Sequence, residues 1–189
     1  YHALWFDPNE DGDGSYYNLE GESVRGEFLL KPLTYRRISS TFTNSRFHPL
    51  LKTWRGHWGI DYAADRGTDI MATSDGVVIY RGAKGTFGNT VEIRHGNGFI
   101  TRYAHMSRFA TGISVGSRVN QGDVIGYVGM TGLATGPHLH YEMRIRGAPK
   151  DPLAIELPAG DPVPTEQWGG WEGQSRARLD LLDRLPLPW

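Results

Sequence analysis

Three short segments decide the fold of this chain: Gly76-Val77-Val78-Ile79-Tyr80-Arg81-Gly82, Asn89-Thr90-Val91-Glu92-Ile93-Arg94 and Phe99-Ile100-Thr101-Arg102-Tyr103-Ala104. Each is rich in β-branched and aromatic residues and ends in a glycine, an asparagine or a polar turn, which is typical of a β-strand. The second and third are joined by His95-Gly96-Asn97-Gly98, whose Asn-Gly pair is favoured in tight hairpins. The sequence therefore predicts short strands joined by tight turns.

The same β pattern extends from Ile38 to about Asp151 and includes the segment His138–Ile145. Glycine contributes 25 of the 189 residues, nearly twice the ordinary share of roughly 7%, so many tight turns are expected. Short strands at this spacing favour a sandwich or strongly bent sheets. We predict a mainly β fold, with an antiparallel β-sandwich-like core over residues 39–152.

Residues 1–38 are predicted to form an N-terminal hairpin segment, in which two apolar-aromatic runs flank a dense turn signal, Asp7–Gly14. Phe28-Leu29-Leu30 and Tyr35 offer apolar surface that we expect to pack on the core. A calcium loop is the alternative for the turn, since its acidic and amide residues fit the opening of an EF-hand: Asp7, Asn9, Asp11 and Asp13 around Gly12. The twelfth position is Asn18 rather than the glutamate that closes a calcium shell, and no helical pattern flanks the loop. We therefore favour the hairpin.

Residues 153–189 are predicted to be a C-terminal extension that contains proline and tryptophan. Seven of the 11 prolines lie between Pro149 and Pro188, too many for a second core, and only Gln174–Leu185 has helical spacing. Exposed indoles would be a liability. The extension contains three tryptophans, Trp168, Trp171 and Trp189. We expect it to fold back and bury at least two of these indoles against the domain or a symmetry partner. The alternative is a disordered linker.

Composition excludes some classes of function. Lys+Arg total 20 and Asp+Glu 21, which argues against a protein that binds nucleic acid by neutralising phosphates. No apolar run approaches the roughly 18–20 residues of a membrane-spanning helix, so we expect no membrane contact in this fragment. Cysteine is absent and leaves the compartment open. The chain opens at Tyr1 without a signal sequence, which predicts a mature product or a piece of a longer chain.

Two pairs of residues have the spacing of metal ligands: His57 with Asp61 in His57-Trp-Gly-Ile-Asp61, and His138 with His140 in His138-Leu-His140. Residues two or four apart on a strand face the same way, so each pair would present its polar side chains to one surface. Burying a carboxylate and several imidazoles is costly unless they are paired or bind a metal ion. His57, Asp61 and one of His138 or His140 would supply three ligands with one position open, as in a catalytic zinc site. Other divalent ions remain alternatives.

The motifs also resemble a known family. The segments His57–Ala63, Tyr103-Ala-His105-Met106 and Thr131–Glu142, in this order, are similar to those of the lysostaphin-type zinc metalloendopeptidases that cut peptidoglycan peptides. The resemblance extends over about 114 residues, from Ser39 to Pro152, and includes the glycine-rich run Val119–Gly129. The lead-in from Ser39 to Pro49 is similar to that of Gram-negative cell-wall DD-endopeptidases.

This resemblance implies a role for each motif residue. It makes His57, Asp61 and His140 the ligands of Zn2+, and His105 and His138 the catalytic imidazoles. Zinc would polarise the scissile carbonyl and acidify a bound water, while the two imidazoles would move the proton and stabilise the oxyanion. We expect His95 to be structural, His2 to be solvated, and His48 to be structural or to line the cleft.

The implied activity is hydrolysis of peptide cross-links in bacterial peptidoglycan, at D-Ala–diaminopimelate bonds rather than glycyl bridges. The peptide stems would be the partner, the location would be periplasmic or extracellular, and an upstream regulatory domain would precede the chain. A groove is expected between the loops Thr43–Gly56, Gly82–Gly88 and Met106–Gly112. The main alternative is a non-catalytic cell-wall binder or amidase activator of the same fold, in which ligands or catalytic histidines are lost; a calcium-dependent structural module is the other. All five positions are filled here, which favours the enzyme.

Overall fold

The chain forms two compact units. A computed structural model of the protein describes residues 3–8, 14–24, 26, 28–29, 31–47, 52–157 and 160–184. Its contacts separate Phe28–Glu156 from a second unit that combines Tyr1–Glu27 with Leu157–Trp189. The domain limits 1–38, 39–152 and 153–189 stay a prediction. In the described part of the chain, no helix is both long enough and apolar enough to cross a bilayer.

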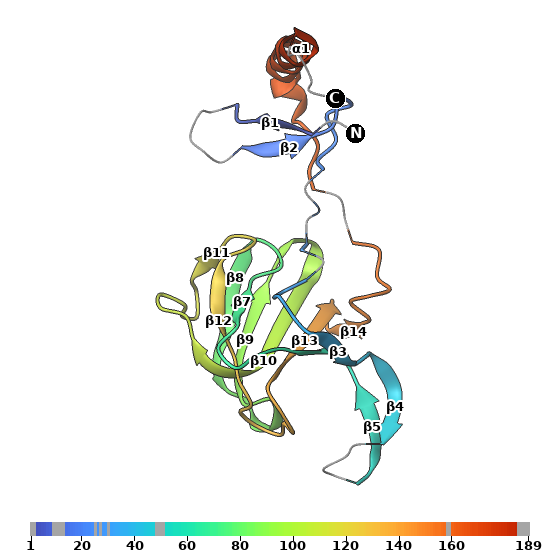
Figure 1. Ribbon diagram of the computed structural model, residues 1–189, viewed down its shortest axis with the longest axis vertical. Coiled ribbons are helices and arrows are strands. Elements are labelled where there is room, and N and C mark those ends of the chain that lie inside the picture. The colour runs from blue at the N-terminus through green and yellow to red at the C-terminus, as the bar shows by residue number, and fades with distance from the viewer. Residues whose placement is uncertain are drawn as a thin grey trace. The chain divides into compact units, whose positions relative to one another are not determined.

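The larger unit is built on an antiparallel sheet (Figure 1). Among the described residues, ten strands belong to it, in the order β11-β8-β9-β10-β13-β6-β3, with β12 between β10 and β7 and with β14 beside β13. Their bounds are β3 Arg37–Ser40, β6 Ile60–Ala63, β7 Asp69–Met71, β8 Gly76–Ala83, β9 Asn89–Arg94, β10 Phe99–Phe109, β11 Arg118–Val119, β12 Val124–Val128, β13 His138–Ile145 and β14 Ala148–Lys150. The mainly antiparallel β fold is confirmed.

Two further strands form a hairpin that extends away from this sheet (Figure 1). They are β4 Thr43–Phe47 and β5 Trp54–His57, paired antiparallel. Short 3-10 turns interrupt the sheet connections at η1 Gly85–Phe87 and η2 Gly96–Gly98. In η2, Asn97 has φ +54°, the left-handed conformation that the Asn-Gly pair accommodates.

The core explains why the central strands form. β-branched and aromatic side chains of neighbouring strands pack together, and several are fully buried: Val91, Ile93, Tyr103, Ile125 and Leu139. The Tyr103 hydroxyl is satisfied inside this core by the backbone N–H of Thr73 at 2.9 Å. Phe28 packs on Phe99 with ring centroids 5.0 Å apart, and Tyr35 on Tyr62 at 4.8 Å. The expected packing of these two aromatic residues on the core is confirmed, whereas Leu30 lies outside the described residues.

Strand β10 changes partner half-way along its length. Up to Ala104 it pairs with β13, and from Met106 it pairs with β12. The ladder with β9 shifts register between Tyr103 and Met106, which marks a β-bulge. His105 lies in this bulge with φ +61°, an uncommon conformation for a residue other than glycine. The bulge re-aims one side chain in the middle of a continuous strand.

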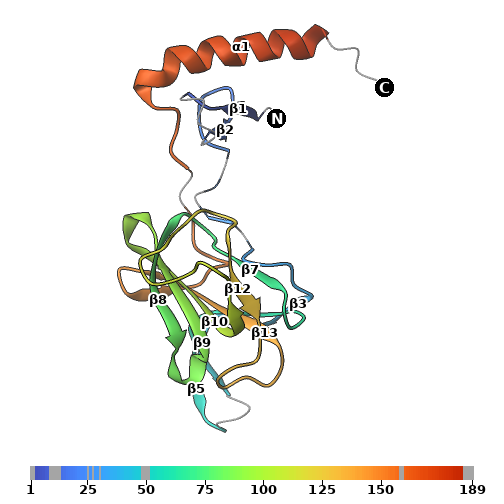
Figure 2. The same ribbon diagram turned by 90° about the vertical axis from the view of Figure 1, so that its left-hand side faces the viewer.

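The smaller unit contains the predicted N-terminal hairpin. Strands β1 Leu4–Phe6 and β2 Ser15–Tyr17 pair antiparallel. The helix α1 Trp168–Arg184 follows the short turn η3 Thr165–Gln167 and lies beside the hairpin in both views (Figure 1, Figure 2). The proposed calcium residues Asn9, Asp11, Gly12 and Asp13 lie outside the described residues. Asn18, in turn, is engaged locally with Glu22 through two hydrogen bonds.

Helix α1 differs from the expectation in its start and in its buried face. It begins at Trp168 rather than Gln174, because Trp171 is 1% exposed and packs edge-on against Phe6 at 5.5 Å. Tertiary packing of this indole outweighs the low helix propensity of the glycines around it. Of the three indoles, Trp171 is buried, Trp168 is 40% exposed and Trp189 lies outside the described residues, so the expectation that at least two are buried stays a prediction. Leu182, inside the segment with helical spacing, is 43% exposed.

Candidate metal centre

Two of the predicted metal ligands lie opposite each other on paired strands. Asp61 of β6 is the direct partner of His140 of β13, and side chains at such positions start about 5 Å apart on one face of a sheet. Both are buried, at 8% and 5% exposure. His138 lies two residues before His140 on the same strand, so it faces the same side.

The third predicted ligand arrives through the tight connection between β5 and β6. His57 ends β5, and only Trp58 and Gly59 separate it from β6. A Cβ atom at Gly59 would lie 2.4 Å from the carbonyl oxygen of Tyr141 and 2.9 Å from Cε1 of His140. Glycine is therefore required here, because the turn that delivers His57 passes directly against strand β13.

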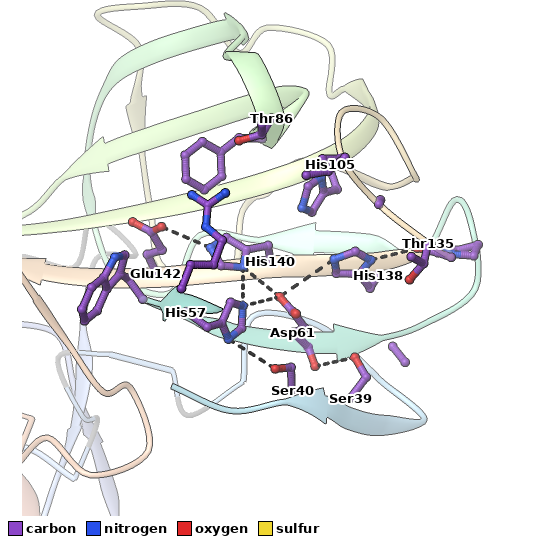
Figure 3. A pocket seen from close by; sticks show the side chains of 18 of the residues that line it. Ser39, Ser40, His57, Asp61, Thr86, His105, Thr135, His138, His140 and Glu142 are labelled. Atoms are coloured by element: carbon purple, nitrogen blue, oxygen red, sulfur yellow. Dashed lines mark hydrogen bonds and ion pairs between the residues drawn. The ribbon is translucent and has the colours of Figure 1, made fainter. Parts of the chain in front are cut away.

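The three side chains converge on one point (Figure 3). Nε2 of His57 lies 3.0 Å from Oδ1 of Asp61 and 3.1 Å from Nδ1 of His140, and Nδ1 of His140 lies 2.7 Å from the same Oδ1. The ligand atoms of these three side chains all lie within 4.8 Å of one another. Among the described residues, no other group of three or more His, Cys, Asp or Glu side chains meets this distance. The structure thus brings together His57, Asp61 and His140, whose roles as ligands stay a prediction.

Outer hydrogen bonds determine which nitrogen of each histidine faces the centre. The carbonyl oxygen of Thr41 accepts from Nδ1 of His57 at 2.8 Å, so its Nε2 presents a lone pair. The Glu142 carboxylate accepts from Nε2 of His140 at 3.2 Å, so its Nδ1 presents a lone pair. Carbonyl and carboxylate partners of this kind are the usual orienting groups of metal-binding histidines.

This arrangement fits a zinc ion. Two imidazole lone pairs and a carboxylate oxygen face one another at 2.7–3.1 Å, a repulsive set unless a cation or a proton lies between them. Ligands bound at 2.0–2.1 Å to a tetrahedral ion lie about 3.3 Å from each other, close to the observed spacing. One carboxylate and two imidazoles, without sulfur, suit zinc among the divalent ions.

The electrostatics of the metal-free group follow the same contacts. When protons rather than a metal ion lie between these groups, burial disfavours the Asp61 carboxylate, but hydrogen bonds from His140 and His57 and the charges of both imidazoles outweigh it and lower the pKa of Asp61. Burial also disfavours a charged His140, yet the carboxylates of Asp61 and Glu142 raise the pKa of His140. The centre therefore holds a carboxylate in its charged form, ready to bind a cation.

His105 and His138, the predicted catalytic residues, lie beside this group with one ring nitrogen each free of the backbone (Figure 3). The carbonyl oxygen of Thr131 accepts from Nδ1 of His105 at 2.7 Å, and that of Gly136 accepts from Nδ1 of His138 at 2.8 Å. Nε2 of His138 lies 3.9 Å from Oδ1 of Asp61. The two rings are 4.6 Å apart, so both can reach one small molecule at the centre.

The pKa of His105 gives a testable dependence of stability on pH. Burial and the neighbouring histidines lower the pKa of His105 from 6.5 to about 4, against the opposing hydrogen bond to Thr131. Between pH 6.5 and 4 the unfolded chain binds a proton that the folded chain does not, so the free energy of unfolding falls as the pH falls, by up to about 1.4 kcal/mol per pH unit. In the metal-free protein, His105→Gln should reduce this slope by about one proton, measured by urea unfolding at pH 6.5 and 4.5. An unchanged slope would contradict the low pKa.

A cleft of about 520 Å³ surrounds the centre. Thr86 and His105 lie on one side of the ligand group in Figure 3, and Ser39 and Ser40 on the other. The expected walls are found in part: Arg55 and Gly56 from the first predicted loop and Thr86 and Phe87 from the second line the cleft.

The third expected wall, Met106–Gly112, is wrong. Met106 is fully buried, and residues through Phe109 belong to β10 and pair with β12. The segment 133–137 lines the cleft instead. It is the glycine-containing connection that leads directly into His138, a signal already present in the sequence.

The remaining histidines are separate from the centre or lie outside the described part. His95 is buried, where its Nδ1 donates to the carbonyl oxygen of Asp75 at 2.7 Å and its Nε2 lies 2.7 Å from Oγ1 of Thr101, as expected of a structural histidine. His2 and His48 lie outside the described residues. Sequence reasoning missed Glu142, Arg102 and the cleft residue Arg37. Glu142 could have been found, because it follows His140 by two residues on the same face of the strand.

Known proteins match both the sequence and the fold. The chain is 50% identical over 161 residues to DD-carboxypeptidase/endopeptidase Mpg of Neisseria meningitidis serogroup B, a match that covers 85% of this chain and 36% of Mpg. It is 39% identical over 175 residues to peptidoglycan DD-endopeptidase ShyC of Vibrio cholerae serotype O1, covering 93% of this chain and 40% of ShyC. A zinc containing peptidase from Vibrio cholerae, known from a crystal structure, aligns with a TM-score of 0.66 and 34% identity over 82% of this chain and 47% of its own.

The chain spans well under half the length of these two curated relatives. Residues 55–152, more than half of the chain, match Peptidase family M23. This range contains all five motif residues: His57, Asp61, His105, His138 and His140. The chain belongs to Peptidase family M23, as the resemblance of its histidine motifs predicted.

Proposed function

We propose that this chain is a zinc-dependent endopeptidase that hydrolyses peptide cross-links of bacterial peptidoglycan, at D-Ala–diaminopimelate bonds. The observation that carries the proposal is the buried group His57, Asp61 and His140, with two further imidazoles beside it in an open cleft. The names of Mpg and ShyC, both DD-endopeptidases, support the reaction and the substrate. The name of the zinc containing peptidase from Vibrio cholerae supports the metal.

The side chains divide the chemistry between them. Zinc held by His57, Asp61 and His140 would act as a Lewis acid and lower the pKa of a water molecule to about 7. The lowered pKa of His105 keeps its imidazole neutral at pH 7, so Nε2 can accept the proton of the attacking water. His138 faces the same space and can stabilise the oxyanion and help return a proton to the leaving amine.

Two exposed arginines in the cleft fit a substrate that carries carboxylates. Arg37 and Arg55 line the cleft, and neither side chain makes a hydrogen bond or an ion pair with another described residue. They belong to different strands, β3 and β5. A diaminopimelate residue in a direct cross-link bears a free carboxylate next to the scissile amide, whereas a glycyl bridge bears none. Guanidinium groups recognise carboxylates through paired hydrogen bonds.

We therefore expect the double variant Arg37→Ala/Arg55→Ala to raise KM for a diaminopimelate cross-linked muropeptide about tenfold, with kcat nearly unchanged. Two exposed charge contacts of about 0.7 kcal/mol each give this factor. Arg36→Ala is the matched control, since Arg36 pairs with Asp65 and does not line the cleft. Equal KM values for the double variant and the control would contradict a role in substrate binding.

The alternative, a non-catalytic binder or amidase activator, is disfavoured because each of the five catalytic and ligand positions is occupied by the required residue type. The proposed activity implies a location in the cell envelope, with peptidoglycan peptide stems as the partner. The upstream regulatory domain stays a prediction.

Digestion of purified sacculi tests the proposal. The zinc-loaded protein should release monomeric muropeptides from direct D-Ala–diaminopimelate cross-links, detected by mass spectrometry, and His138→Ala should release them at least about 100-fold more slowly. Cleavage confined to pentaglycine bridges would overturn the proposed bond. Binding to sacculi without any cleavage would favour the non-catalytic alternative.

A further inference from the structure

A buried ion network lies directly behind the metal centre. Glu142 is 2% exposed, and its Oε1 accepts the hydrogen bond from Nε2 of His140. Its other oxygen, Oε2, accepts from Arg102 at 2.8 Å and from Arg144 at 3.2 Å. The carboxylate that orients a predicted zinc ligand is therefore itself held in place by two arginines.

Arg102 occupies the centre of this network because of the strand register. On β10 it is the direct partner of Glu142 on β13 and of Glu92 on β9. Its Nε donates to Glu92 at 2.5 Å, and Lys84 donates to the same Glu92 oxygen at 2.8 Å. One guanidinium thus bridges two buried carboxylates on both neighbouring strands.

The same guanidinium also contacts the wall of the cleft. It lies 4.5 Å from the ring centroid of Phe87, a cation–π distance. Phe87 lines the cleft, and its ring lies 5.5 Å from that of His140. Arg102 therefore reaches the predicted ligand His140 through Glu142 and directly contacts Phe87, a side chain of the cleft wall.

We propose that Arg102 is a positioning residue that fixes His140 through Glu142 and fixes the cleft wall through Phe87. This rests on the proposed zinc site. Without Arg102, the buried carboxylates Glu92 and Glu142 would lose their common buried cation, and each would keep only a more exposed partner, Lys84 or Arg144; such loss of one member of a buried ion network is unfavourable. Glu142 would leave its present position, and His140 would lose the acceptor that orients its ring.

Arg144 is the matched control. It donates to the same Oε2 of Glu142, but its side chain is 30% exposed, and it contacts neither Glu92 nor Phe87 through any described hydrogen bond or ring contact. A general loss of positive charge near Glu142 would affect both arginines alike. A positioning role that depends on the ion pairs with both Glu92 and Glu142 and on the contact with Phe87 predicts an effect for Arg102 alone.

The test compares zinc affinities of metal-free proteins by competition with a chromophoric chelator. Arg102→Met should weaken zinc binding about 10–100-fold, the range found for removal of outer partners of metal-binding histidines, and Arg144→Met by less than about threefold. Arg102→Met should also raise KM for the cross-linked muropeptide, whereas Glu142→Gln should weaken zinc binding with little change in KM. Equal zinc affinities for Arg102→Met and wild type would overturn the proposal.

A double variant keeps the test decisive if Arg102→Met folds poorly. Glu142→Gln retains an oxygen for His140 and removes the charge that needs Arg102, so the double variant Glu142→Gln/Arg102→Met should bind zinc as tightly as Glu142→Gln alone. Additive losses would show that Arg102 does not act through Glu142. A wild-type protein that binds no zinc would instead refute the proposed function, a result distinct from either outcome for Arg102.

Discussion

Replacing Asp61 with alanine is expected to abolish zinc binding and turnover together. Asp61 supplies the anionic member of the predicted ligand set, and its Oδ1 lies within 3.0 Å of both ligand nitrogens. Its removal leaves two neutral imidazoles in a buried site, and two such ligands do not compensate a zinc ion for its lost hydration. We expect zinc affinity to fall by at least about 100-fold, because a charged ligand is lost in addition to a contact.

The measurement is the zinc content of purified protein after dialysis, together with chelator competition. Asp65→Ala is the control, since Asp65 lies four residues further along, on the exposed surface, and pairs with Arg36. Asp65→Ala should keep one zinc ion per chain and full turnover. Full zinc occupancy in Asp61→Ala would show that the ligand assignment is wrong.

Much of the fold could be predicted because strand formation here is decided locally. Residues 89–94 and His138–Ile145 were expected as strands with the bounds that β9 and β13 have, since β-branched and aromatic residues are interrupted by clear turn signals on both sides. The sequence also indicated that Asp61 and His140 lie on polar faces of their strands. Alternation places polar residues on one face of each strand, and only a metal ion or ion pairs make such a face stable inside a protein.

The remaining features depend on contacts between distant segments. Nothing in Thr101–Phe109 shows that β10 exchanges one partner for another at His105, because the bulge results from the register of β12 and β13. The early start of α1 depends on a pocket for Trp171 beside Phe6, which is 165 residues earlier in the chain. The network around Arg102 likewise requires three strands in one register, which local patterns do not specify.

Replacing either predicted catalytic histidine, His105 or His138, is expected to lower turnover without changing the zinc content. The Nδ1–H of His105 and that of His138 are both committed to backbone carbonyls, and neither residue belongs to the ligand group. Single variants His105→Ala and His138→Ala should therefore keep zinc at wild-type stoichiometry. Each should lower kcat by about 10²–10⁴-fold, the usual contribution of a positioned acid–base group.

The bulge makes His105 the more informative of the pair. Its φ of +61° aims the imidazole at the centre, and Thr131 holds the ring there, so His105→Asn, which tolerates the same backbone conformation, should keep the fold and still lose turnover. His95→Asn is the control for general damage, because it removes a buried histidine elsewhere in the sheet and should lower stability while leaving kcat unchanged. Loss of zinc from His105→Ala or His138→Ala as complete as from Asp61→Ala would contradict the division into ligands and catalytic residues. Retained zinc with turnover near zero would leave proton transfer and oxyanion stabilisation as the functions that these imidazoles perform.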